Sequence, residues 1–69
     1  MGKIVKGDYV RFKSDIRLGR LKNVYIVIAV SDVYNMVRLR NRDTGFIISW
    51  YPASDVSRVA FFQPELSAR

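Results

Sequence analysis

The fold is decided by residues 45–59, which read GFIISWYPASDVSRV. Residues 46–51 are apolar and aromatic, as in a β-strand, and Pro52 is expected to end that strand because proline cannot donate to a sheet ladder. Residues 53–56 then suit one turn of 3₁₀ helix, with Val56 filling the core. A strand, a forced break and a second strand so close together predict a small β-barrel.

Three strands are expected before this segment, at 9–13, 24–30 and 36–41. The first and third alternate apolar and polar residues, as half-buried strands do, and place Val37 and Leu39 on one face of the third. The middle one is a continuous β-branched run, which predicts burial on both faces. Residues 41–45 turn the chain, with Gly45 in a left-handed position.

The remaining segments complete the expected organisation. Residues 14–23 show no sustained period and predict a long basic loop, with Ile16, Leu18 and Leu21 folded back onto the barrel. Residues 57–62 predict a short last strand, and 63–69 a loosely ordered polar tail. We therefore expect one all-β domain over 1–62, a five-stranded SH3-like barrel with a 3₁₀ turn before the last strand, or alternatively an OB-type barrel.

Composition narrows the class of protein. The chain has 69 residues, no cysteine and no histidine, so disulfides and the usual zinc sites cannot support its small core. Nearly half of the residues are hydrophobic, which makes a homo-oligomer a candidate. The longest apolar run, 24–30, is far below the roughly 20 residues that cross a bilayer. We expect a cytoplasmic protein without membrane contact.

The chain lacks the residue types on which most catalytic mechanisms depend. Without histidine or cysteine there is no imidazole base, no thiolate and no Ser-His-Asp arrangement. The six carboxylates are dispersed over predicted turns and the tail, and the four glycines form no phosphate-binding fingerprint. We expect a protein that is not an enzyme and has no cofactor and no catalytic or metal-binding residue.

The formal net charge of +6 indicates a polyanionic partner, either a nucleic acid or an acidic protein surface. Arginines at period two on the third strand share one face, and further basic residues on the early loop are expected nearby. Tyrosines add possible stacking platforms for single-stranded nucleic acid. The candidate binding residues are Arg38, Arg40, Arg42, Arg17, Arg20, Lys22, Tyr25 and Tyr34, with Tyr9 as a further platform. An ordinary solvated strand face explains the same arginines without any ligand.

Two segments resemble a known enzyme family. GDYVRFKS at 7–14 is similar to the GDRVRKKS opening of the plasmid-borne type II dihydrofolate reductases, and YPASDVSRV at 51–59 to their YPVAALERI close. The resemblance implies an SH3-like barrel that forms a tetramer around a pore for dihydrofolate and NADPH. The family's VQIY motif is replaced by Ile48-Ser49-Trp50-Tyr51, which keeps only the tyrosine, and Phe12 stands at the pore lysine.

The opening at 7–14 is also similar to KOW-type and other bacterial or phage SH3-like barrels. We therefore predict a non-enzymatic binding module that contacts nucleic acid or an acidic protein surface. One alternative is an oligomeric enzyme of the type II reductase kind. The other is a phage or mobile-element protein that binds and modulates a host protein, for which Val27, Ala29 and Ile47 supply apolar outer positions.

Overall fold

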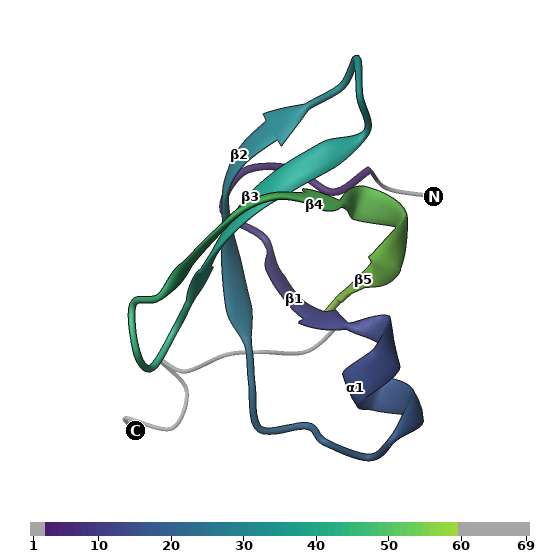
Figure 1. The fold of residues 1–69 in the computed structure, drawn as a ribbon, viewed down its shortest axis with the longest axis vertical. Coiled ribbons are helices and arrows are strands. Elements are labelled where there is room, and N and C mark those ends of the chain that lie inside the picture. Colours follow the sequence, from purple (N-terminus) through teal and green to yellow (C-terminus); the bar gives the residue numbers. More distant parts are fainter. Residues whose placement is uncertain (1–2, 60–69) are drawn as a thin grey trace, which may run out of the picture.

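A computed structural model describes residues 3–59 of the chain. Seven elements follow one another: β1 (Tyr9–Phe12), α1 (Lys13–Arg17), β2 (Tyr25–Ser31), β3 (Met36–Asn41), β4 (Ile47–Pro52), the 3₁₀ turn η1 (Ala53–Asp55) and β5 (Val56–Arg58). The strands form one antiparallel sheet in the order β4-β3-β2-β1-β5. The sheet coils around its core, with α1 at one end and the β2–β3 hairpin projecting at the other (Figure 1).

The expected fold class is confirmed. The structure is an all-β, barrel-like sheet with η1 before its last strand, although within residues 3–59 the two edge strands, β4 and β5, do not pair to close it. Pro52 ends β4, and Val56 is almost fully buried, as the segment 45–59 predicts. Gly45 has φ +80°, the left-handed conformation expected of the β3–β4 turn.

One face of the coiled sheet forms the core. The buried cluster consists of Val10, Tyr25, Val27, Val37, Leu39 and Val56. Aromatic rings extend it toward α1, because Phe12 stacks on Tyr25 at 4.7 Å and on Tyr51 at 4.6 Å between ring centroids. The rings of these three residues therefore join β1, β2 and β4 through a single stack.

The early loop differs from its prediction. Its first residues form the short helix α1, which packs against β1, and the apolar residues expected to fold back are exposed: Ile16, Leu18 and Leu21. A polar contact fixes this segment, since Arg11 Nε donates to the Leu21 carbonyl at 3.1 Å. This hydrogen bond therefore fixes the loop to the sheet through its backbone, while the apolar side chains of the loop stay exposed.

β2 is not buried on both faces as predicted. It begins at Tyr25, and only Tyr25 and Val27 within it are buried, while the others are partly exposed. Val27 was expected to face outward with Ala29, but it pairs with Leu39 on the core side. Val27 alternates regularly with the buried Tyr25, and a β-bulge at Ile28 then shifts the alternation so that Ala29 faces outward.

The last strand is shorter than expected in the described part of the chain. β5 ends at Arg58, and residues 60–62 of the predicted strand lie outside the described residues. The predicted tail at 63–69 also lies outside them. No helix in the described part is long and apolar enough to cross a membrane.

Candidate nucleic-acid interface

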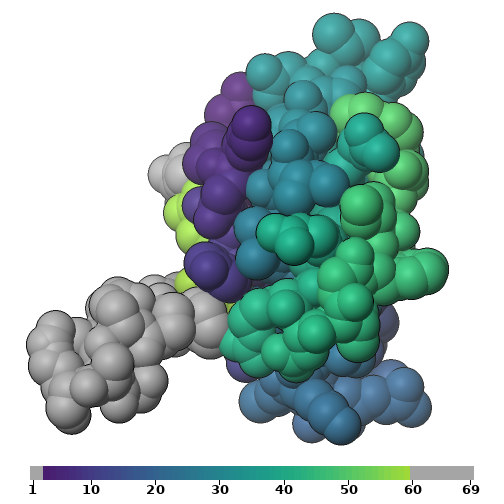
Figure 2. Space-filling model, turned by 90° about the vertical axis from the view of Figure 1, so that its left-hand side faces the viewer, coloured from purple at the N-terminus to yellow at the C-terminus, as the bar shows by residue number. Residues whose placement is uncertain are grey.

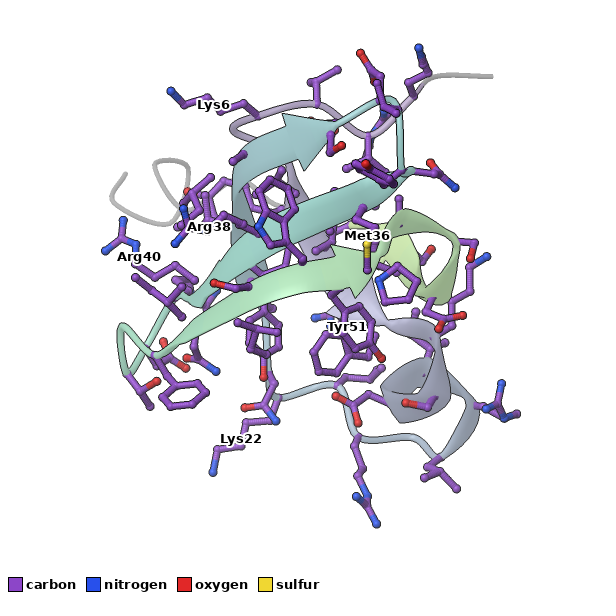
Figure 3. The ribbon with its side chains drawn as sticks, turned by 45° about the horizontal axis from the view of Figure 1, so that its top comes forward. Lys6, Lys22, Met36, Arg38, Arg40 and Tyr51 are labelled. Carbon is purple, nitrogen blue, oxygen red and sulfur yellow. The ribbon has the colours of Figure 1, made fainter. Side chains whose placement is uncertain are left out.

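Arg38 lies on the outer face of the sheet, on β3, the strand whose bounds the alternation predicts. Val37 and Leu39 on either side of it are fully buried, so the Arg38 side chain leaves the opposite face of β3. Arg40 follows on the same face and is exposed. The two arginines point to the same side of the molecule (Figure 3). Their expected period-two arrangement is therefore confirmed.

Both neighbours of β3 are irregular beside Arg38. In β2 the pairing passes from Val27 to Ala29, the partner of Arg38, and leaves Ile28 as an extra residue. In β4 two residues, Ser49 and Trp50, lie opposite Arg38 alone. Bulges are concentrated near functional sites, where they re-aim side chains.

The bulge in β4 holds Trp50 in a strained conformation. Its φ is +55°, a left-handed value that is unfavourable for a bulky residue. In this position the indole contacts the outer face, and the Arg38 guanidinium carbon lies 5.8 Å from the ring centroid. That distance is within the range of a cation–π interaction.

The Arg38 Nε is buried, and no hydrogen-bond acceptor reaches it. An unsatisfied buried donor is unfavourable by about 1–3 kcal/mol, so such groups are rare and call for an explanation. The guanidinium is thus held by an aromatic ring on one side while one of its donors lacks a partner.

An apolar groove of about 480 Å³ adjoins this pair and is lined by Ser31, Tyr34, Met36 and Trp50. Tyr34 is 76% exposed and Trp50 is 44% exposed. The turn at the end of the β2–β3 hairpin presents Tyr34, and the Ser31 hydroxyl accepts a hydrogen bond from the Tyr34 N–H at 3.3 Å. Two accessible aromatic rings and a thioether suit a flat, apolar group such as a nucleobase.

Lys6 joins the basic residues of this face, although sequence reasoning did not select it. The N-terminal segment lies alongside β2 (Figure 2), because Gly7 N–H donates to the Val27 carbonyl at 2.8 Å. Lys6 points to the same side as Arg38 and Arg40 (Figure 3). The position of Lys6 depends on the pairing of Gly7 with Val27, which the local sequence does not predict. We name Lys6, Arg38, Arg40, Tyr34, Met36 and Trp50 the Arg38 face.

Other predicted site residues lie elsewhere. Lys22 lies well away from Arg38 and Arg40 (Figure 3), and Arg17 is on α1, which contacts β1. The early loop is held to β1 by α1 and the Arg11–Leu21 contact, and only its end comes beside the third strand, where the Val24 carbonyl accepts from the Arg42 N–H at 2.9 Å. Arg20 belongs to this same loop. Arg42 follows β3 in the turn, where its Nε pairs with Asp43 Oδ1 at 3.2 Å.

The predicted tyrosine platforms divide in the same way. Tyr34 is on the Arg38 face, but Tyr25 is only 8% exposed and packs in the core against Phe12, so its prediction as a stacking platform is wrong. Its ring belongs to the inner face of β2, opposite Asn41. Tyr9 is partly buried on β1. The exposure of a tyrosine side chain depends on which face of its strand is turned toward the core.

The residues that correspond to the reductase motif lie on the two sides of β4. Tyr51 and Phe12 stack on each other beneath β4, while Trp50 faces the opposite side. Within residues 3–59, no group of three or more His, Cys, Asp or Glu side chains is arranged to hold a metal ion. Comparison of the chain with protein-family models, curated proteins and solved structures finds no match.

Proposed function

We propose that the chain is a non-enzymatic module that binds single-stranded nucleic acid on the Arg38 face. The observation that carries the proposal is the Arg38–Trp50 pair, in which a guanidinium lies over an accessible indole that also lines the aromatic groove. A phosphate oxygen would accept from Arg38, and an unstacked base would enter the groove.

The chemistry of the face favours a nucleic acid over an acidic protein. Carboxylates would satisfy the arginines equally well, but they leave the groove with Tyr34, Met36 and Trp50 unused. A single strand offers both a phosphate and a flat base within each nucleotide. A duplex offers the phosphates but keeps its bases stacked, so the groove favours a single strand.

The test is the affinity of the full chain for a labelled single-stranded oligonucleotide at several salt concentrations. The Arg38→Ala/Arg40→Ala variant is expected to lose affinity by about tenfold or more, and its salt slope should fall by about 1.4, or about 0.7 for each lost phosphate contact. The matched control, Arg20→Ala/Lys22→Ala, removes the same charge from the distant loop and should keep the parent slope.

Two further ligands decide between partners. The same bases in a duplex should bind more weakly than the single strand, and polyglutamate should bind more weakly than either. Tighter binding of polyglutamate would contradict the proposal in favour of an acidic protein surface. An unchanged affinity and salt slope in the Arg38→Ala/Arg40→Ala variant would also contradict it.

A further inference from the structure

A second cavity lies on the other side of β4 from the groove. It has a volume of about 230 Å³ and is lined by Lys13, Ser14, Arg17, Tyr51 and Asp55. Trp50 lines the groove and Tyr51 lines this cavity, so consecutive residues of β4 face two different sites. We call it the α1 cavity.

Three elements build the walls of the α1 cavity. Lys13 and Arg17 are four residues apart on α1 and therefore lie on the same side of the helix. The turn η1, forced by Pro52, supplies Asp55. Tyr51 is held by its stacking on Phe12, with an angle of 24° between the rings. The position of the Tyr51 ring is thus fixed by the core.

The charges around the α1 cavity are not paired with one another. In the described part of the chain, Lys13, Arg17 and Asp55 form no ion pair, although all three line the same space. Two cations and one carboxylate around one space suit a ligand with two kinds of polar group, an anion for the cations and a hydrogen-bond donor for the carboxylate.

We propose that the α1 cavity binds a sugar phosphate, with the phosphate between Lys13 and Arg17 and a sugar hydroxyl donating to Asp55. Lysine and arginine are the usual partners of phosphate, and a carboxylate is a common acceptor for ribose hydroxyls. A bare phosphate fits less well, because it brings negative charge toward Asp55 and offers it little in return. This site is separate from the Arg38 face and does not depend on the function proposed for it.

The test is a titration of the isotope-labelled full chain followed by amide chemical shifts. Ribose 5-phosphate should bind saturably and several-fold more tightly than inorganic phosphate, with shifts in α1 and η1 but not in β3. Ribose alone should cause no saturable change. Shifts that spread evenly over the basic surface, or equal affinities for ribose 5-phosphate and inorganic phosphate, would overturn the proposal.

Variants separate the two halves of the site. Lys13→Ala/Arg17→Ala should abolish binding of both phosphates, while the control Arg20→Ala should leave it unchanged. Asp55→Asn should act in opposite directions, tightening inorganic phosphate and removing the advantage of ribose 5-phosphate. All these positions are exposed, so the fold should persist. An Asp55→Asn variant that keeps the parent preference would overturn the role of the carboxylate.

Two sources offer this chemistry, a free nucleotide and the 5′ end of an RNA. Uridine monophosphate and a short 5′-phosphorylated RNA, titrated into Arg38→Ala/Arg40→Ala, compare them while the Arg38 face is disabled. Tighter binding of the RNA supports RNA ends as the ligand, and tighter binding of the mononucleotide supports free nucleotides. Absence of saturable binding by both would overturn the proposal without affecting the one for the Arg38 face.

Discussion

The two faces of β3 are built in opposite ways. On the inner face Val37 and Leu39 are fully buried, and regular pairs with both neighbouring strands surround them. On the outer face Arg38 lies between two bulges, beside a tryptophan with a left-handed backbone and with an unsatisfied buried donor. The same six-residue strand thus presents one fully buried apolar face and one face beside irregular pairing on both sides. The contrast teaches that both bulges and the left-handed backbone of Trp50 lie beside Arg38, on the face we propose for binding.

The largest loss of stability is expected from a substitution on the inner face of β3. Leu39→Ala removes a fully buried side chain and should lower the free energy of unfolding by about 2–5 kcal/mol, because the cavity it leaves cannot fully collapse. The exposed neighbour is the matched control: Arg40→Ala should change stability by less than about 0.5 kcal/mol. Urea denaturation measures both. Similar losses in the two variants would remove the contrast between the faces.

A smaller loss of stability is expected at the C-terminal end of β3, where Asn41 is buried. Its Oδ1 accepts from the Asp43 N–H at 2.8 Å and from the Thr44 N–H at 3.0 Å, which fixes the β3–β4 turn. Asn41→Ala should lower the free energy of unfolding by about 1–2 kcal/mol, as for other lost side-chain caps. Asn41→Asp keeps the acceptor and should recover most of the loss. If Asp recovers nothing in the same denaturation experiment, the turn does not depend on these hydrogen bonds.

The smallest effect on stability is expected at Trp50, on the outer face. At Trp50 a glycine adopts φ +55° without a Cβ penalty, so Trp50→Gly should be more stable than Trp50→Ala by about 1 kcal/mol. At Ile47, in the same strand, the order should reverse, since glycine weakens an ordinary strand. Thermal unfolding of the four variants gives both differences. Alanine more stable than glycine at both positions would show that Trp50 is not strained.

The sequence predicts those features that depend on neighbouring residues. The bounds of β3 follow from its alternation, and Pro52 and Gly45 fix their breaks through their own backbone limits. Of the three arginines expected on one face, Arg38 and Arg40 lie there for the same local reason, whereas Arg42 lies in the turn after β3. These features need no knowledge of what the strand pairs with.

The remainder depends on partners distant in the chain. The bulges at Ile28 and Trp50 belong to the register of three strands, and they decide that Ala29 and Trp50 face outward. Lys6 reaches the Arg38 face only because Gly7 pairs with β2. Helix α1 is too short to leave a periodic signal in the sequence, so its packing against β1, which carries Arg17 away from β3, cannot be predicted from local residues.

Trp50 is the only tryptophan of the chain, so its fluorescence reports directly on the Arg38 face. We would titrate the full chain and Arg38→Ala/Arg40→Ala with a single-stranded oligonucleotide and follow the emission of Trp50. The account predicts a saturable change in the parent, at the concentrations where the oligonucleotide binds, and its loss in the variant. Oligonucleotide binding that leaves the Trp50 emission unchanged, or equal titration curves for the two proteins, would contradict it.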